Sequence, residues 1–131
     1  ERNRRADVSR VNVQLKNALE ADLLVTLFPE GTSSDGTQVL PFQASLLQPA
    51  VELQAPVTPG FLSYRGLDGN RADDIAYFGD RDLLPCLLAL LHRKKTTATL
   101  RCSQAVEALD RKKLTASLHS EVLRLSREEP L

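Results

Sequence analysis

The sequence predicts an α/β fold in which a mainly parallel sheet is flanked by helices. Segments with helical spacing of apolar residues alternate with short runs rich in Leu, Val and Thr. The run 23–28 is apolar at almost every position, as expected of a strand buried on both faces, and Pro29 ends it because proline cannot donate to a β ladder. The resulting order, from a first helix to a fourth with three strands between them, is typical of a parallel sheet covered by helices.

The first half of the chain is predicted to hold a helix, a strand, a loop and a second helix. Residues 9–22 form an amphipathic helix, because apolar residues recur there every three or four positions. They are Val11, Leu15, Ala18 and Leu19. The strand 23–28 and a loop follow, and residues 43–53 have helical composition. Pro49 is expected to break that helix or to begin a second short turn.

The second half begins with a predicted strand at 57–64 and a long excursion at 65–82. The excursion is rich in Gly, Asp and Arg, and connections of that length are often functional or mobile. A helix is predicted at 83–92, with a dense face of leucines. Basic residues at 93–95 follow it, so the helix could lie on a membrane, but a core helix with a basic last turn is the favoured interpretation.

The last two elements are predicted to be a strand at 96–102 and a helix at 111–127. The strand is rich in β-branched residues, and Asp110 is suited to cap the helix. Apolar residues lie on one side of the helix. They are Leu114, Leu118, Val122 and Leu125.

Composition places the chain among single globular domains and removes several classes of function. Its 131 residues are 42% hydrophobic and 26% charged, but the absence of Met and the start at Glu1 suggest a piece of a longer protein. Residues 1–131 are therefore interpreted as one partial domain. Seventeen basic and seventeen acidic side chains cancel, so no nucleic-acid partner is expected. Cys86 and Cys102 are interpreted as reduced thiols, and no metal site or membrane-spanning run is indicated.

The residues best placed for chemistry follow the run 23–28. Glu30 supplies a carboxylate, and Gly31 and Gly36 permit backbone conformations that let the chain approach a ligand closely. Taken alone, a glutamate at the end of a strand is more often solvated or hydrogen-bonded to turn amides.

The run Phe-Pro-Glu-Gly-Thr-Ser-Ser at 28–34 resembles the third signature block of the glycerolipid acyltransferase family, the 1-acylglycerol-3-phosphate acyltransferases. That block is usually Phe-Pro-Glu-Gly-Thr-Arg-Ser. Residues 39–47 look like the apolar segment that follows it, and residues 55–59 are similar to the fourth block. Residues 77–80 resemble bacterial members, and Glu1-Arg2 looks like the end of the second block, Gly-x-x-Phe-x-x-Arg.

The resemblance implies transfer of a fatty acyl group from a thioester carrier to the free hydroxyl of a lysophospholipid. Acyl-CoA or acyl carrier protein would be the donor, and no other cofactor is implied. Arg2 would bind the phosphate of the acceptor, and Glu30, Gly31 and Thr32 would position it. The enzyme would work at the cytoplasmic face of a membrane, the inner membrane in a bacterium.

The family's first block, His-x-x-x-x-Asp, supplies the general base and does not occur in this sequence. His92 and His119 are followed five positions later by Thr97 and Arg124. No catalytic residue is therefore assigned, the acyltransferase-like fold is interpreted as truncated at its N-terminus, and the 131-residue chain alone is expected to be inactive.

Three alternatives stay open. Ser33 stands where many members carry arginine, which resembles the branches that acylate lyso-ornithine lipid, an acceptor without phosphate. A non-catalytic domain that binds lipid or protein is a second alternative. An unrelated α/β hydrolase is poorly supported, because no Gly-x-Ser-x-Gly turn is present.

Overall fold

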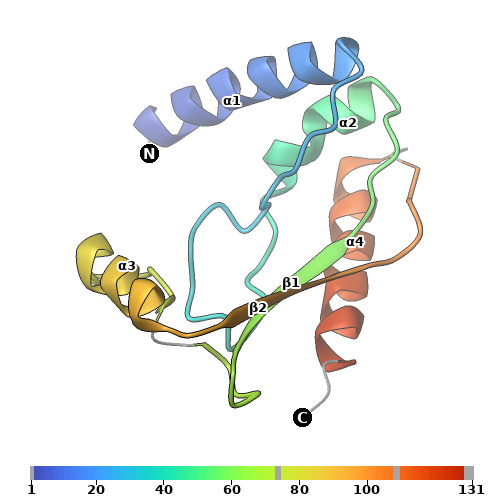
Figure 1. Cartoon of the computed structure of the whole chain (residues 1–131). Coiled ribbons are helices and arrows are strands. Elements are labelled where there is room, and N and C mark those ends of the chain that lie inside the picture. Colours follow the sequence, from blue (N-terminus) through green and yellow to red (C-terminus); the bar gives the residue numbers. More distant parts are fainter. Residues whose placement is uncertain (1, 73–74, 108–109, 129–131) are drawn as a thin grey trace.

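The computed structural model describes residues 2–72, 75–107 and 110–128, with residues 2–6 limited to the backbone. Four α-helices, one 3-10 helix and two strands lie in this part of the chain (Figure 1). In order they are α1 (Arg2–Glu20), η1 (Ala44–Leu47), α2 (Gln48–Glu52), β1 (Gly60–Gly66), α3 (Leu83–His92), β2 (Thr96–Cys102) and α4 (Arg111–Arg127).

The prediction of a mainly parallel sheet is wrong. β1 and β2 pair antiparallel, with Gly60 opposite Cys102 and Gly66 opposite Thr96. A further antiparallel bridge joins Val57 to Val106. An alternation of helices and strands does not by itself set strand direction, and the long connection from β1 through α3 gives the chain room to return antiparallel. The acyltransferase-like α/β prediction therefore holds only as a mixture of helices and a small sheet.

The predicted strand 23–28 is also wrong. These six residues, all of them described, form irregular extended chain between α1 and the following loop. Leu24 is fully exposed, and only Val25 and Leu27 among the apolar residues of the run are half-buried. A strand needs a hydrogen-bonded neighbour, and both described strands pair with each other instead.

Two of the helices agree closely with the sequence, α3 and α4, whereas α1 begins seven residues before the predicted start at 9 and ends two residues before the predicted end at 22. α4 begins and ends at the predicted residues, and Asp110 Oδ1 accepts a hydrogen bond of 2.8 Å from the Lys113 amide. Its four predicted core residues are buried. Pro49 separates η1 from α2, as predicted, by occupying the first turn of α2.

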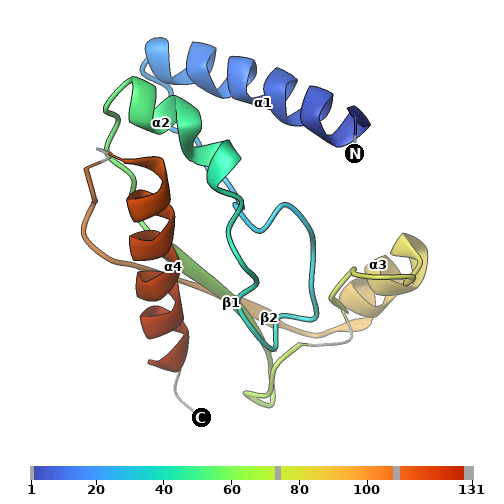
Figure 2. The same ribbon diagram turned by 180° about the vertical axis from the view of Figure 1, so that it is seen from behind.

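The core is small and lies where η1 meets α4. Leu47, Leu114 and Leu118 form its buried centre. Partly buried apolar residues surround it: Leu27, Phe42, Val51, Val57 and Val106. α1 packs on α2 above this core (Figure 2), where Asn12 Nδ2 donates to the Ser45 carbonyl at 2.9 Å. Each leucine that becomes fully buried adds about 1.5–3 kcal/mol to stability.

α3 has the predicted bounds but is not the core helix that the sequence favoured. Cys86 is the one buried residue among its ten, and Leu84 and Leu91 are 64% and 70% exposed. Both views show α3 standing apart from α1, α2 and α4 (Figures 1 and 2). Amphipathic spacing predicts an apolar face, but it does not say what covers that face.

Glu121 on α4 gives a prediction for the pH dependence of stability. Arg124 donates to it from Nε and Nη2, and these bonds, with a weaker one from Ser103, lower the pKa of Glu121 from 4.5 to about 2. A carboxyl with a depressed folded pKa stabilises the fold above the unfolded pKa, and this contribution disappears as pH falls from about 4.5 to about 2. NMR titration of Arg124→Gln is expected to return the pKa of Glu121 toward 4.5.

Arg127→Gln removes the same charge from the same turn of α4 and serves as the control. An equal shift of the Glu121 titration in both variants would contradict the assigned hydrogen bonds.

Candidate functional site

The loop 28–36 leaves the core after Leu27 and is closed by residues that follow it. The Gly31 amide donates to the Phe28 carbonyl at 3.2 Å, and the Gln43 amide donates to the Pro29 carbonyl at 2.7 Å. The loop hangs between α1 and α2 on one side and the β1–β2 sheet on the other (Figure 1). The start of the loop is therefore tied to the segment that follows it, which fixes the turn at Glu30 and Gly31.

Glu30 takes part in this closure. Its Oε2 accepts a hydrogen bond of 3.2 Å from the Leu40 amide, and its side chain is half-buried. A carboxylate that accepts from a backbone amide makes a stronger bond than a neutral acceptor would. The carboxylate of the motif thus has a structural role in the loop, whatever else it binds.

Gly31 is required by both backbone and space. Its φ is +68°, a conformation that L-residues rarely adopt. An added Cβ would overlap Nε2 of Gln43 and lie 2.8 Å from its Cδ. The Gln43 side chain lies over the glycine because its Nε2 donates to the Glu30 carbonyl at 3.2 Å.

The second half of the loop is a polar turn around Asp35. Asp35 Oδ1 accepts from the amide and the hydroxyl of Thr37, at 2.9 and 2.7 Å. These bonds lower the pKa of Asp35 below its usual value, with smaller contributions from Arg71 and Arg81. Arg71 Nη2 also donates to the Asp35 carbonyl at 3.3 Å, which joins the loop to the segment after β1.

The excursion 65–82 starts with an ordered turn. The Gly66 amide donates to the Asn70 carbonyl at 2.8 Å, and the Ala72 amide donates to the Tyr64 carbonyl at 3.1 Å. Further along, the Arg81 guanidinium lies over the Phe78 ring, 4.5 Å from its centroid. The excursion thus brings cationic side chains to the same side of the molecule as the loop.

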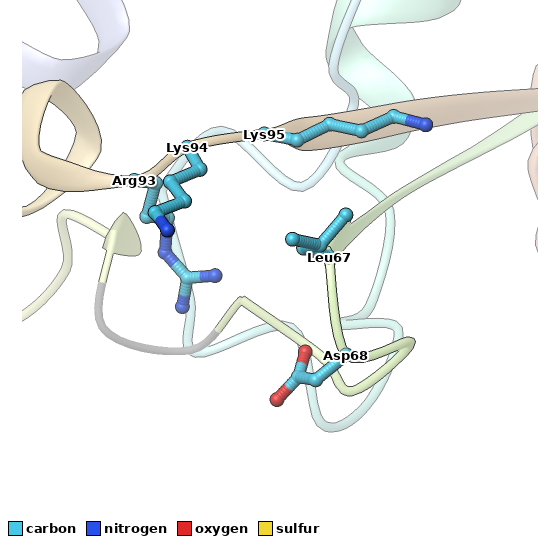
Figure 3. A pocket seen from close by; sticks show the side chains of 5 residues that line it. All are labelled: Leu67, Asp68, Arg93, Lys94 and Lys95. Atoms are coloured by element: carbon cyan, nitrogen blue, oxygen red, sulfur yellow. The ribbon is translucent and has the colours of Figure 1, made fainter.

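An open pocket of about 390 Å³ lies where the two strands separate. The ladder ends at the Gly66–Thr96 pair, and the lining residues come directly after β1 and directly before β2. They are Leu67, Asp68, Arg93, Lys94 and Lys95. Arg93 and Lys94 point into the opening from one side, while Leu67 and Asp68 face them from the turn (Figure 3).

Arg93 and Asp68 meet above Gly66. An added Cβ on Gly66 would lie 2.6 Å from Arg93 Nη1 and 2.7 Å from Asp68 Oδ1. Hydrogen bonds from Asn70 lower the pKa of Asp68, and the charge of Arg93 lowers it further. Arg93 is therefore partly balanced within the protein, and Lys94 and Lys95 supply the net positive charge of the pocket.

The structure brings some of the predicted site residues together. Glu30 and Gly31 lie in the closed turn, and Thr32 is exposed beside them, with its Oγ1 3.4 Å from the Ser33 carbonyl. Arg2 lies in the first turn of α1, but its side chain is outside the described residues, so its predicted contact with phosphate stays a prediction.

Sequence reasoning missed the residues that hold the loop and those that line the pocket. Gln43 lies within the segment 39–47, which the sequence identifies only as an apolar run after the loop, and nothing in the sequence pairs Asp35 with Arg71. The basic residues 93–95 were visible, but their position opposite Leu67 and Asp68 depends on strand register.

No group of three or more His, Cys, Asp or Glu side chains that could hold a metal ion occurs in the described part of the chain. None of the helices within the described ranges is long and apolar enough to cross a bilayer.

The sequence was compared with protein-family models and with characterised proteins. A family model described as Acyltransferase matches residues 1–63, which include the loop and the segment that closes it. The chain belongs to this acyltransferase family. The resemblance noted from the motif at 28–34 is thereby confirmed.

Relatives of two kinds support the assignment. The chain is 34% identical over 96 residues to a 1-acyl-sn-glycerol-3-phosphate acyltransferase of Neisseria gonorrhoeae, covering 73% of this chain and 37% of that protein. It is 30% identical over 110 residues to a lyso-ornithine lipid O-acyltransferase of Pseudomonas aeruginosa, covering 82% and 42%. A lyso-ornithine lipid O-acyltransferase of Brucella abortus is 28% identical over 137 residues, covering 93% and 51%.

The chain thus spans between 37% and 51% of the length of these acyltransferases. No solved structure matches it significantly.

The glycine at position 31 yields a prediction with an internal control. Gly31 and Gly69 both have positive φ, but only Gly31 is crowded, whereas an added Cβ at Gly69 meets nothing within 4 Å. Gly69→Ala carries the backbone strain alone, about 1–2 kcal/mol. Gly31→Ala is expected to lower stability by more than Gly69→Ala, measured by urea denaturation.

The double variant Gly31→Ala with Gln43→Ala removes the overlap and should recover part of the loss. Equal destabilisation by Gly31→Ala and Gly69→Ala would show that Gln43 does not constrain the loop.

Proposed function

We propose that the full-length protein moves a fatty acyl group from a thioester carrier to the free hydroxyl of a lysophospholipid, converting 1-acylglycerol-3-phosphate to phosphatidate. In this proposal the loop 28–36 holds the acceptor. The observation that carries it is the closed turn at Glu30 and Gly31 within a chain of the acyltransferase family. Acyl-CoA or acyl carrier protein supplies the thioester, and the reaction takes place at the cytoplasmic face of a membrane.

The chemistry divides the work between this chain and a general base. The base removes the proton of the acceptor hydroxyl as its oxygen attacks the thioester carbonyl, and the thiolate of the carrier leaves. The sequence has no His-x-x-x-x-Asp, so this chain is assigned the holding of the acceptor. Holding alone is valuable, because fixing two reactants in position can remove several kcal/mol of the barrier.

In this proposal, separate roles are assigned to Glu30, Gly31 and Thr32. The Gly31 amide is already used by the Phe28 carbonyl, so it does not donate to substrate. Its lack of a side chain allows the tight turn that presents Glu30 and the exposed Thr32 hydroxyl. Arg2 binds the phosphate of the acceptor, as a guanidinium can make two parallel hydrogen bonds to it.

Lyso-ornithine lipid is the second candidate acceptor. Ser33 stands where many members of the family carry arginine, so this turn lacks that cation. The relatives that act on lyso-ornithine lipid match 82% and 93% of this chain. The relative that acts on the phosphate-bearing acceptor is more identical over a shorter stretch. The identity of the acceptor headgroup is therefore a question for an activity assay.

The acceptor test uses the full-length protein with each donor in turn. Transfer to lysophosphatidate is expected, and Ser33→Arg should raise kcat/KM for lysophosphatidate relative to lyso-ornithine lipid because it adds a charge beside the phosphate. Ser120→Arg, an exposed position on α4, controls for the added charge. The 131-residue chain assayed alone should give no transfer.

Transfer to lyso-ornithine lipid alone would replace the first acceptor with the second. Transfer to neither, by a folded protein, would favour a non-catalytic binding domain derived from the family.

Glu30→Gln separates the structural role of this residue from its proposed role toward substrate. Glutamine keeps an oxygen that can accept from the Leu40 amide, so the urea midpoint should change little. Loss of the negative charge is expected to lower kcat/KM by about tenfold or more, since hydrogen bonds to charged groups contribute about 1.5–3 kcal/mol.

Glu107→Gln, at an exposed position, is the matched control and should keep full activity. Wild-type kcat/KM in Glu30→Gln would mean that the carboxylate only closes the loop.

A further inference from the structure

The chain exposes much more surface than a folded protein of its mass. Its accessible surface is 9602 Å², whereas a monomer of 14.5 kDa is expected to expose about 6,900 Å². On α3, all six leucines are exposed. They are Leu83, Leu84, Leu87, Leu88, Leu90 and Leu91.

We propose that α3 and the basic segment 93–95 form a site that binds the surface of an anionic lipid bilayer. The leucines enter the boundary between headgroups and acyl chains, and Lys94 and Lys95 contact lipid phosphates. The proposal extends the proposed function, on which its biological purpose rests, but it concerns a different surface from the acceptor loop.

The leucines share one broad side of the helix. At 100° per residue they span an arc of about 160°, and Cys86 lies outside that arc. Cys86, just beyond the edge of the arc, is buried with its Sγ 3.6 Å from the Ala76 carbonyl, and the half-buried Ala89 lies opposite the centre of the arc, so the side away from the leucines is the one attached to the protein. The helix is therefore anchored on one side and presents a continuous apolar face on the other.

The charges lie where an interfacial helix needs them. Three consecutive cations follow the last turn, and they line the pocket at the end of the sheet (Figure 3). Asp68 is the acidic member of that lining and lies near the Arg93 guanidinium, and Lys94 and Lys95 are both exposed. The acidic residues Asp80 and Asp82 lie before the other end of the helix, away from the basic segment.

An anionic bilayer fits this combination better than a protein partner does. Lysine and arginine extend from an apolar face toward headgroups while their methylene stems stay among the apolar atoms. Leu67 adds a 68% exposed apolar side chain across the pocket from Arg93 and Lys94. A second copy of the chain in antiparallel orientation would instead place Lys94 and Lys95 beside Asp80 and Asp82, and sedimentation tests for that arrangement.

The site also lies close to the acceptor loop. Asp35 of the loop is bonded to Arg71, which belongs to the excursion between β1 and α3. Binding through α3 would hold the loop near the layer in which a lysolipid resides. The effect on the proposed reaction is delivery of the acceptor, not chemistry.

The test introduces a single tryptophan as a fluorescent probe, which reports without background because the chain contains no tryptophan of its own. Leu87→Trp places one probe on the apolar face of α3. Addition of vesicles of phosphatidylcholine with 30% phosphatidylglycerol is expected to shift its emission to the blue, and brominated acyl chains should quench it. Lys94→Ala with Lys95→Ala should weaken partitioning into these vesicles about thirtyfold, at about 1 kcal/mol per cation.

Lys112→Ala with Lys113→Ala removes two exposed cations from α4 and is the matched control, which should bind as the parent does. Leu84→Ser with Leu91→Ser should reduce binding to anionic and to pure phosphatidylcholine vesicles alike. The partition measurements are repeated with the full-length protein, and the partition coefficients of the two double-lysine variants are compared.

Three results would overturn the proposal. Equal binding by the two lysine variants would remove the role of the basic segment. An emission that is already blue-shifted before lipid is added, and that brominated lipid then fails to quench, would mean that protein covers α3. The covering protein would be either the same polypeptide or a second copy, and sedimentation would detect the second copy. Bound protein with an unshifted probe would place the contact elsewhere. The vesicle experiments measure no turnover, so a negative result in them does not affect the acyl-transfer assays. In the same way, a negative acyl-transfer result does not affect the test of lipid binding.

Discussion

The packing of Leu47 against Leu114 and Leu118 is the contact on which the rest of the molecule depends. It joins η1 to α4 across more than sixty residues of sequence. Leu27, directly before the motif loop, and Phe42, between the two residues that close it, both pack on this cluster. The hydrophobic effect thus fixes the two ends of the loop, and the hydrogen bonds of Glu30 and Gln43 then determine its shape. Phe42 also meets the His119 ring edge-on at 5.0 Å, which links the same segment to the middle of α4.

This arrangement explains why one glutamate can serve two purposes. A carboxylate has two oxygens, and the structure assigns Oε2 to the Leu40 amide. A loop that is already closed before substrate arrives loses little conformational entropy on binding, so the energy of each contact with the acceptor is retained. The structural and functional interpretations of Glu30, which compete when only the sequence is considered, are therefore compatible.

The positions of α3, α4 and β2 could be predicted from the sequence, and the pairing of the strands could not. α3 and α4 follow from apolar spacing and from the cap at Asp110, which are local properties of the chain. Strand direction and pairing depend on which segments meet in space, and the run 23–28 shows how an apolar stretch reads as a buried strand when it has no partner to pair with. The same limit applies to α3, because its leucines identify a face and not its occupant. At the candidate site, Glu30 and Gly31 were recognisable from the motif, whereas Gln43 became visible only when the loop was seen to fold back on itself.

The overlap between Gly31 and Gln43 has a consequence for how this sequence can change over time. The two positions are twelve residues apart, yet the space above the glycine is filled by the glutamine side chain. Variation at position 43 should therefore be restricted to side chains that reach the Glu30 carbonyl without crowding the turn, and a change there would alter which residues are tolerated at position 31. The two positions should vary as a pair, and that covariation would be a sequence record of the closed loop.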